Sequence, residues 1–155
     1  MRPRPITSAA GLLLAALLAL PRPAAAQVAV TYFPFQSVLG VASNPERRLW
    51  AGLNVETNTF ISNVNVELHG LVNLHRAETV NAYLGLGVNT NPAAAVNELP
   101  LLNGYLLTLG TRLKPLAANR RVQVVFELAP YVNTSFDGGT LRTLLGLSYS
   151  FRRRD

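Results

Sequence analysis

Apolar and polar residues alternate one by one along most of this chain, which is the period of a β-strand and not of a helix. Val122, Val124 and Phe126, for example, fall on one face of such a strand, and Gln123 and Glu127 fall on the other. The segments with this pattern are Val28–Phe33, Ser37–Ala42, Leu49–Glu56, Val64–His75, Val80–Asn89, Tyr105–Leu113, Arg121–Val132 and Leu141–Arg152.

The length and spacing of these segments predict a barrel that crosses a membrane. From Leu49 onward they are about 8 to 12 residues long, close to the length that tilted spanning strands need, whereas soluble strands usually have about 5 or 6 residues. Short connections at 44–46, 76–79 and 115–119 alternate with longer ones at 58–62, 91–102 and 133–139. We therefore predict an all-β fold, an antiparallel up-and-down transmembrane β-barrel.

The number of strands depends on the first part of the chain. Bacterial single-chain barrels have even numbers of strands, and eight is common among the smallest. Val28–Phe33 and Ser37–Ala42 supply the two strands that complete eight, with Phe33-Pro34-Phe35 as the break between them. The alternative is one long, bent first strand and a barrel of seven.

The composition of the two faces predicts which of them points outward. A water-exposed surface is about a quarter to a third Lys, Arg, Glu and Asp. Here the polar faces are rich in glycine, asparagine and serine, and Lys114 is the only lysine of the chain. Small uncharged residues suit a narrow interior, so we expect the valine, leucine and aromatic faces to meet lipid. The alternative is a secreted soluble barrel that binds a hydrophobic ligand in an apolar interior.

Charged residues fall into two predicted groups. Five lie within strands on the polar face and predict a network inside the barrel, because an unpaired buried charge is costly. Its members are Glu56, Glu67, Arg112, Glu127 and Arg142. The other group forms a basic rim at the short turns, either binding an anionic surface or polymer or meeting lipid headgroups. It consists of Arg47, Arg48, Arg76, Lys114, Arg120, Arg121, Arg152, Arg153 and Arg154.

No constellation of residues predicts catalysis, a cofactor or a bound metal. His69 and His75 share the polar face, and we expect both to be interior hydrogen-bonding residues. Ser62 lies near the opposite rim from His75 on the same strand, so the two cannot act together. The sequence holds no phosphate loop and no dinucleotide fingerprint, and its arginines lack the interleaved aromatic residues of a nucleic-acid surface. We therefore expect no enzymatic activity and no nucleic-acid partner.

The N-terminal 26 residues have the layout of a cleavable signal peptide. Arg2 and Arg4 precede an apolar run, Pro21 ends the run, and Ala24-Ala25-Ala26 offers a cleavage site. That run is shorter than the roughly 20 residues of a spanning helix. Residues 27–155 then form one domain, and the chain has no cysteine for a disulfide.

The last strand, Leu141 to Phe151, alternates apolar residues and ends in an aromatic residue, and it resembles the closing β-signal of bacterial outer-membrane barrels. From Trp50 onward the pattern is similar to that of the small OmpX/OmpA-type barrels, although Arg152-Arg153-Arg154-Asp155 follows the terminal aromatic residue. The resemblance implies location in the outer membrane, periplasmic short turns and external loops. It also implies outer-membrane lipids, periplasmic chaperones and an insertion complex as partners.

The sequence leaves the biological role open among three classes. The first is a structural or interaction barrel that acts through its loops and has no wide pore, because side chains fill the interior of a barrel with eight strands. The second is the soluble ligand-binding barrel. The third is a membrane-embedded, lipid-modifying enzyme, for which no nucleophile and base are suitably placed.

Overall fold

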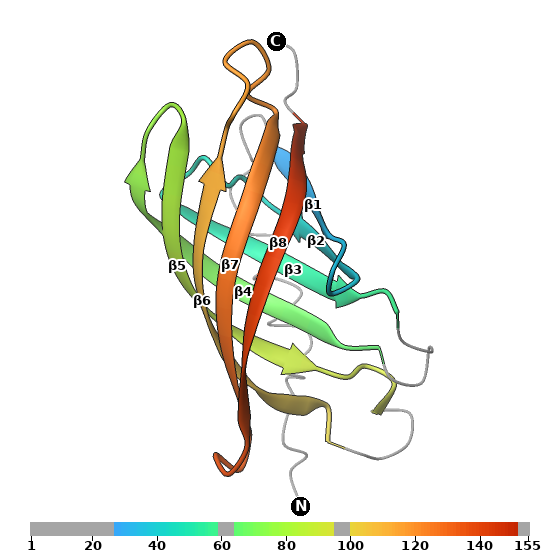
Figure 1. The fold of residues 1–155 in the computed structure, drawn as a ribbon. Coiled ribbons are helices and arrows are strands. Elements are labelled where there is room, and N and C mark those ends of the chain that lie inside the picture. The colour runs from blue at the N-terminus through green and yellow to red at the C-terminus, as the bar shows by residue number, and fades with distance from the viewer. Residues whose placement is uncertain (1–26, 59–63, 95–99, 152–155) are drawn as a thin grey trace, which may run out of the picture.

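A computed structural model describes residues 27–58, 64–94 and 100–151, and shows a closed barrel of eight antiparallel strands (Figure 1). The signal peptide predicted at residues 1–26 lies outside the described residues, as do Ser62, Arg152, Arg153 and Arg154. Among the described residues no helix has the length and apolar character needed to cross a membrane. The strands are β1 (Val28–Phe33), β2 (Val38–Ala42), β3 (Leu49–Glu56), β4 (Val66–Arg76), β5 (Val80–Thr90), β6 (Leu102–Leu113), β7 (Val122–Asn133) and β8 (Gly139–Phe151).

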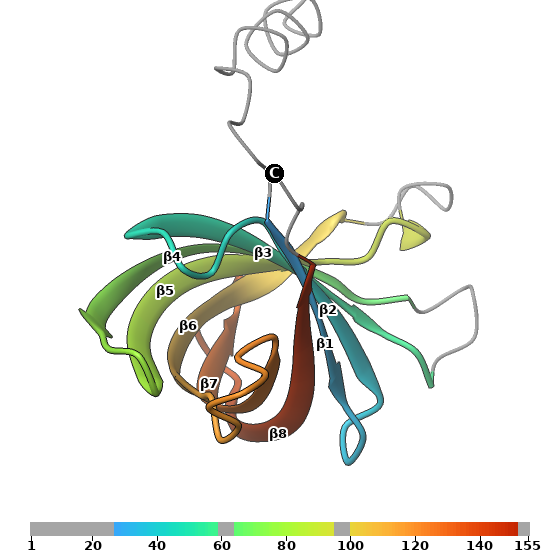
Figure 2. The same cartoon turned by 90° about the horizontal axis from the view of Figure 1, so that it is seen from above.

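Each strand pairs with the next along the chain, and the barrel closes where β1 pairs with β8. Val28 lies opposite Phe151 at one end of this seam, and Tyr32 lies opposite Leu147 at the other. Figure 2 shows the strands curving around the resulting ring. The predicted all-β, antiparallel up-and-down barrel and its count of eight strands are confirmed, and the alternative of seven strands is wrong.

The two ends of the barrel differ in the connections that they carry. One end, named here the turn end, holds the connections 43–48, 77–79 and 114–121 together with the described termini, Gln27 and Phe151. The other, the loop end, holds the connections 34–37 and 134–138 and the described residues that follow β3 and β5 and precede β4 and β6. The predicted separation by length is only partly correct, because 114–121 is longer than both 34–37 and 134–138.

The alternation in the sequence becomes an inside and an outside in the structure. Side chains of the apolar face are exposed on the outer surface, with Leu86 at 70% and Leu147 at 62% exposed. Side chains of the polar face are buried toward the barrel axis, down to 0% exposure for Asn81 and 1% for Gln123. The outer surface includes Val28, Tyr32, Leu39, Val41, Leu49, Leu53, Leu68, Leu86, Tyr105, Leu109, Leu113, Phe126, Leu141, Leu145, Leu147, Tyr149 and Phe151.

A β-bulge in β4 changes the side of the barrel wall on which His75 lies. Asn73 pairs with Tyr83, but His75 pairs with Ala82, so the register shifts by one residue between them. Such a bulge reverses the direction of the side chains that follow it. His75 is therefore exposed on the surface, and the prediction that it lies inside the barrel is wrong.

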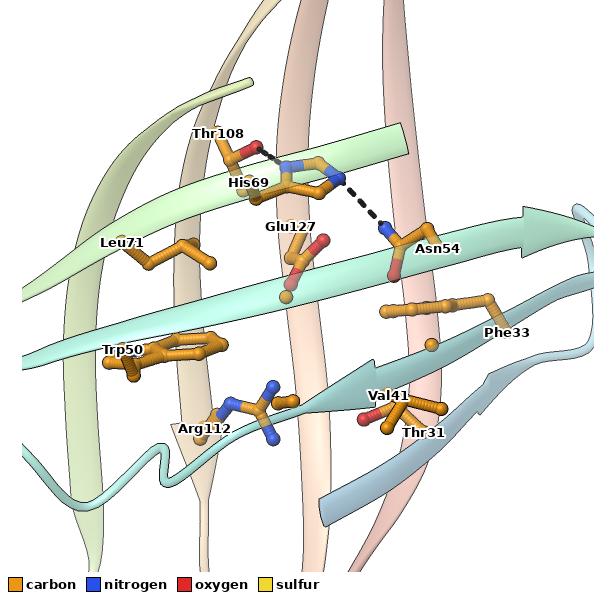
Figure 3. Close-up of a pocket in the computed structure, with 13 residues that line it drawn as sticks. Thr31, Phe33, Val41, Trp50, Asn54, His69, Leu71, Thr108, Arg112 and Glu127 are labelled. Atoms are coloured by element: carbon orange, nitrogen blue, oxygen red, sulfur yellow. Dashed lines mark hydrogen bonds between the residues drawn. The ribbon is translucent and has the colours of Figure 1, made fainter. Parts of the chain in front are cut away.

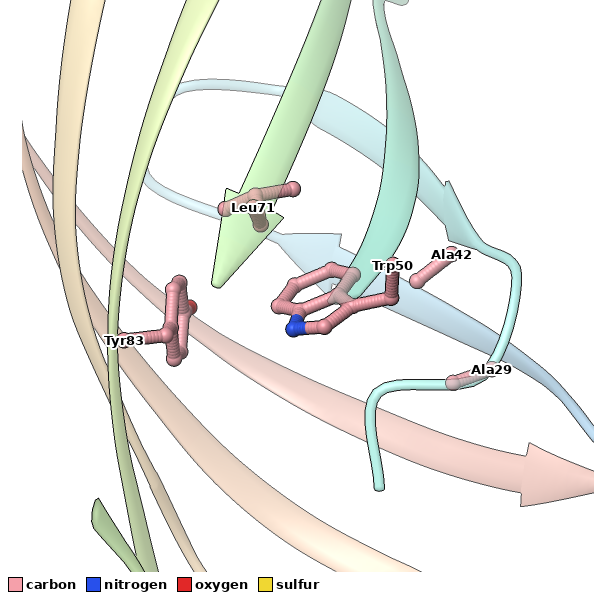
Figure 4. Close-up of a cluster of buried hydrophobic side chains, with 5 residues drawn as sticks. All are labelled: Ala29, Ala42, Trp50, Leu71 and Tyr83. Atoms are coloured by element: carbon pink, nitrogen blue, oxygen red, sulfur yellow. The ribbon is translucent and has the colours of Figure 1, made fainter. Parts of the chain in front are cut away.

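Large side chains fill the centre of the barrel because glycines opposite them leave room. The ring of Tyr83 lies so close to Gly110 that a Cβ there would be 2.2 Å from Tyr83 Cζ. Tyr83 packs edge-on against Trp50, with 5.2 Å between the ring centroids. These two rings and Leu71 form the apolar layer of Figure 4, next to Ala29 and Ala42.

Candidate functional site

The interior of the barrel is the candidate site, because it holds nearly all of the buried polar side chains. At mid-height, Tyr83 donates a 2.5 Å hydrogen bond to Glu127 Oε1, linking β5 to β7. The guanidinium of Arg112 lies over the Trp50 ring, 4.9 Å from its centroid, and donates to Ser148 Oγ at 3.1 Å. This arrangement stabilises a buried cation through aromatic faces and a hydroxyl.

Nearer the loop end, an ion-pair cluster joins opposite walls of the barrel. Arg142 on β8 contacts Glu67 on β4 at 2.5 Å and Glu56 on β3 at 3.7 Å. Glu67 Oε2 lies 3.6 Å from His69 Nε2. Both carboxylates thus share one guanidinium, which offsets the cost of holding them away from water.

Amide side chains extend this cluster toward the loops. Asn89 donates to Glu67 and Asn65 donates to Glu56, at 3.1 and 3.0 Å. Asn103 donates in turn to the side-chain oxygens of both Asn65 and Asn89. The carboxylates are therefore held by several donors at once and have fixed positions.

His69 is engaged through both of its ring nitrogens, as Figure 3 shows. Nε2 lies 3.3 Å from Asn54 Nδ2, and Nδ1 lies 3.1 Å from Thr108 Oγ1. A neutral imidazole that accepts from Asn54 and donates to Thr108 satisfies both contacts. Among the described residues, no group of three or more His, Asp or Glu side chains is arranged to hold a metal ion.

A second ion pair lies in the interior at the turn end of the barrel. Lys114 is 8% exposed and contacts Glu46 Oε2 at 2.8 Å. Asn81 and Gln123 also donate to the Glu46 carboxylate, both at 3.3 Å. Burial raises the pKa of Glu46, but the hydrogen bonds from Lys114, Asn81 and Gln123 and the charge of Lys114 outweigh it, so the pKa lies below its ordinary value.

The free space in the middle of the barrel is very small. The cavity of Figure 3, bounded among others by Trp50, His69 and Arg112, has a volume of about 20 Å³. This volume is on the order of one water molecule. In the described part of the barrel, side chains therefore occupy its centre and leave no wide passage.

The structure distributes the five predicted interior charges over two layers. Glu56, Glu67 and Arg142 are in contact with one another. Arg112 and Glu127 are also buried, but among the described residues they contact Ser148, Tyr83 and aromatic rings and form no ion pair. The predicted network is therefore divided in two. Glu56, Glu67 and Arg142 form an ion-pair cluster near the loop end, and Arg112 and Glu127 lie in a separate layer at the centre of the barrel.

The described members of the predicted basic rim lie at the turn end, with one exception. The arginines at this end are exposed, namely Arg47, Arg48, Arg76, Arg120 and Arg121. Lys114 is instead buried in the interior at the turn end. The placement of Lys114 on the rim is therefore corrected, because the carboxylate of Glu46 binds it inside the barrel. The interior charge network predicted from the sequence does not include Glu46, because no local pattern signals its contact with Lys114.

Comparisons of the chain with protein-family models, with curated proteins and with solved structures give no match. The class of protein that the structure defines is accordingly a small antiparallel β-barrel of eight strands with a filled polar interior.

Proposed function

We propose that this protein is an integral barrel of the bacterial outer membrane, with a structural or interaction role carried by its loops. The observation that supports the proposal is the distribution of apolar and polar side chains, which is the opposite of that in a soluble protein. Apolar side chains cover the outer wall, and the buried interior holds Glu67, Arg112 and Glu127. Contiguous apolar surfaces of this extent are rare on soluble monomers, whereas a membrane barrel requires one.

Aromatic residues mark the two ends of the apolar surface. Tyr149 and Phe151 pack together near the turn end, with their ring centroids 4.9 Å apart. Tyr105 and Phe136 stack at the loop end, at 5.8 Å. Aromatic girdles at both membrane–water interfaces are typical of outer-membrane barrels. The two pairs place aromatic rings at both ends of the apolar surface, where such girdles are expected.

The loop end has the features of an interaction surface. Phe35 and Phe136 are 78% and 71% exposed at the tips of two connections. Phe136 has a φ of 60°, a conformation that is unfavourable for a bulky residue. The Asn133 side chain accepts from the backbone of Asp137 and Gly138 and holds this turn. The chain thus holds Phe136 beside Tyr105 at a local cost, and the exposed Phe35 ring is the one that fits a contact made by the loops.

The contents of the interior favour this role over the two alternatives. A hydrophobic ligand needs an apolar cavity, but the central cavity measures about 20 Å³ and is bounded partly by Arg112, His69 and Glu127. A hydrolase needs an available base, but His69 is held by Asn54 and Thr108, and Tyr83 binds the Glu127 carboxylate. We propose accordingly that the barrel is neither a wide pore nor an enzyme.

The proposal includes the route of export. Residues 1–26 act as the signal peptide, and periplasmic chaperones and an insertion complex deliver the barrel to the outer-membrane lipids. The turn end then faces the periplasm, and the loop end faces outward. Two chain features support this assignment, the aromatic residue that ends β8 and the described termini at the turn end.

Cell fractionation and site-directed labelling test the proposal. The chain has no native cysteine, so single substitutions report on one position each. Val124→Cys and Leu147→Cys should lie in the outer-membrane fraction and react only with lipid-soluble probes, and the unboiled protein should migrate faster in gels. Gln123→Cys and Ser148→Cys provide the inward-facing controls. Recovery of the folded protein in a detergent-free soluble fraction, or rapid labelling of Val124→Cys from water, would contradict the proposal.

A further inference from the structure

The turn end contains a second, much larger cavity. Its volume is about 650 Å³, within the range of roughly 300–1,000 Å³ that ligand sites occupy. The connections 77–79 and 114–121 form its sides, and both rise from the same end of the barrel in Figure 1. Its charged side chains are Glu46, Arg76, Glu78, Lys114, Arg120 and Arg121.

The charges of this cavity do not cancel. Lys114 is paired with Glu46 at 2.8 Å, and Arg120 is paired with Glu78 at 3.1 Å. Arg76 donates only to the backbone carbonyl of Glu46, at 3.2 Å. Within the described residues, neither Arg76 nor Arg121 forms an ion pair with a carboxylate. In the described part of the chain, the cavity therefore presents two guanidinium groups, those of Arg76 and Arg121, whose charge no carboxylate neutralises.

The floor of the cavity is rigid. Lys114 is buried, and its Glu46 partner also accepts from Asn81 and Gln123. Gln123 reaches further to Ser150 Oγ on β8, at 3.3 Å. Strands from opposite sides of the barrel thus meet beneath the cavity, so the floor does not collapse when a ligand leaves. A preformed site of this kind costs little to order on binding.

We propose that this cavity binds an acidic molecule carrying several carboxylate or phosphate groups, with Arg76 and Arg121 as its principal contacts. Guanidinium groups pair with such anions through two parallel hydrogen bonds. The basic surface continues outside the cavity at Arg47 and Arg48, which suits an extended ligand with groups beyond the one bound inside. The inference rests on the proposed function only for the compartment in which the ligand is met, namely the periplasm.

The binding test uses the full chain in micelles of an uncharged detergent, with hexaglutamate and inorganic phosphate as soluble probes. Trp50 is the only tryptophan, and its ring nitrogen donates to Asn73, which in turn binds the backbone of Pro45 and Arg47 in the 43–48 turn. Its fluorescence therefore reports on the turn that carries Glu46. We expect saturable binding of hexaglutamate, and weaker binding of phosphate because it supplies a single group.

Two variants of equal charge separate the cavity from the rim. Arg76→Gln with Arg121→Gln removes both contacts inside the cavity, and Arg47→Gln with Arg48→Gln removes the same charge outside it. The first pair should weaken hexaglutamate binding by about tenfold or more, and the second by about twofold. Equal losses in the two variants would show general attraction to a basic surface and would overturn the proposal.

A neutral variant tests whether the ligand enters. Ala118 is exposed and lines the cavity, so Ala118→Phe narrows it without changing any charge. Loss of hexaglutamate binding in this variant supports entry, and unchanged binding overturns it. Binding of anionic vesicles with no binding of hexaglutamate would assign the arginines to lipid headgroups and also overturn the proposal. All of these outcomes are distinguishable from failure of the proposed function, which appears as a protein that is soluble without detergent.

Discussion

Arg142 on β8 binds Glu67 on β4 with 2.5 Å between Nη2 and Oε1, across the full width of the barrel. Three strands separate β4 from β8 in either direction around the ring, so this ion pair connects opposite walls. Glu67 is 3% exposed, and Arg142 also contacts Glu56. The contact links β4 to β8 through the interior of the barrel, and its side chains fill the interior near the loop end.

Glu67→Gln should lower the free energy of unfolding by about 1–3 kcal/mol, because it leaves Arg142 with only the more distant Glu56 in a partly buried position. Chemical unfolding in detergent micelles, followed by Trp50 fluorescence, measures the change. Glu78→Gln is the matched control, since its carboxylate is on the surface. Equal stability of Glu67→Gln and the wild type would mean that the cross-barrel pair contributes nothing.

Tyr83→Phe removes only the hydroxyl that binds Glu127, and should destabilise the barrel by about 1–3 kcal/mol. Glu127→Ala should have an effect of the same size, because the two groups satisfy each other. In a double-mutant cycle the combined variant should therefore cost clearly less than the sum of the two. Strict additivity would show that this hydrogen bond does not couple β5 to β7.

Most of the fold follows from the alternation, since a strand of period two can bury only one of its faces. Gln123 and Ser148 lie inside and Val124 and Leu147 lie outside, as the sequence predicts. From the sequence one could expect that interior glycines make room for interior aromatic rings, but not which glycine lies against which ring. That Gly110 accommodates Tyr83 depends on the register of β5 with β6, which pairs these two residues.

The partners inside the barrel could not be predicted from the sequence, because they depend on shear and on local irregularities. The bulge in β4 has no marker in the sequence, and it moves His75 to the outside. Arg112 and Glu127 have opposite charges and lie on the same side of the wall, yet each finds another partner. Lys114 follows the end of β6, and only the closure of the ring brings it to Glu46.

The pH dependence of stability should reflect Glu46. Its pKa in the folded barrel lies below the ordinary value of 4.5 expected for the unfolded chain. The carboxylate therefore contributes stability that is fully present above pH 4.5 and is lost as the pH falls through the lower, folded pKa. The Glu46→Gln variant should lack the stability that the ionised carboxylate contributes. The difference in melting temperature between the wild type and this variant should therefore shrink on acidification from about pH 6 to pH 3.

Glu78 serves as the comparison for this titration. Its hydrogen bond and charge interaction with Arg120 also lower its pKa, but it is exposed to solvent. Salt screens such a pair, so added salt should remove the contribution of Glu78 and leave that of Glu46 largely intact. A Glu46 contribution that disappears in the same salt would place its carboxylate in open water and contradict the buried pair with Lys114.

Gly110 on the inner face should tolerate alanine much less well than Gly70 on the outer face. At Gly110 a Cβ would lie 2.2 Å from the Tyr83 ring, which is 1% exposed and has no room to move. At Gly70 the nearest atom to a Cβ is the Leu86 carbonyl oxygen at 4.0 Å. Gly110→Ala should thus reduce stability by about 1–3 kcal/mol or more, whereas Gly70→Ala should fold as the wild type does. Chemical unfolding in the same detergent compares the two, and a normally stable Gly110→Ala barrel would show that Tyr83 does not occupy the centre.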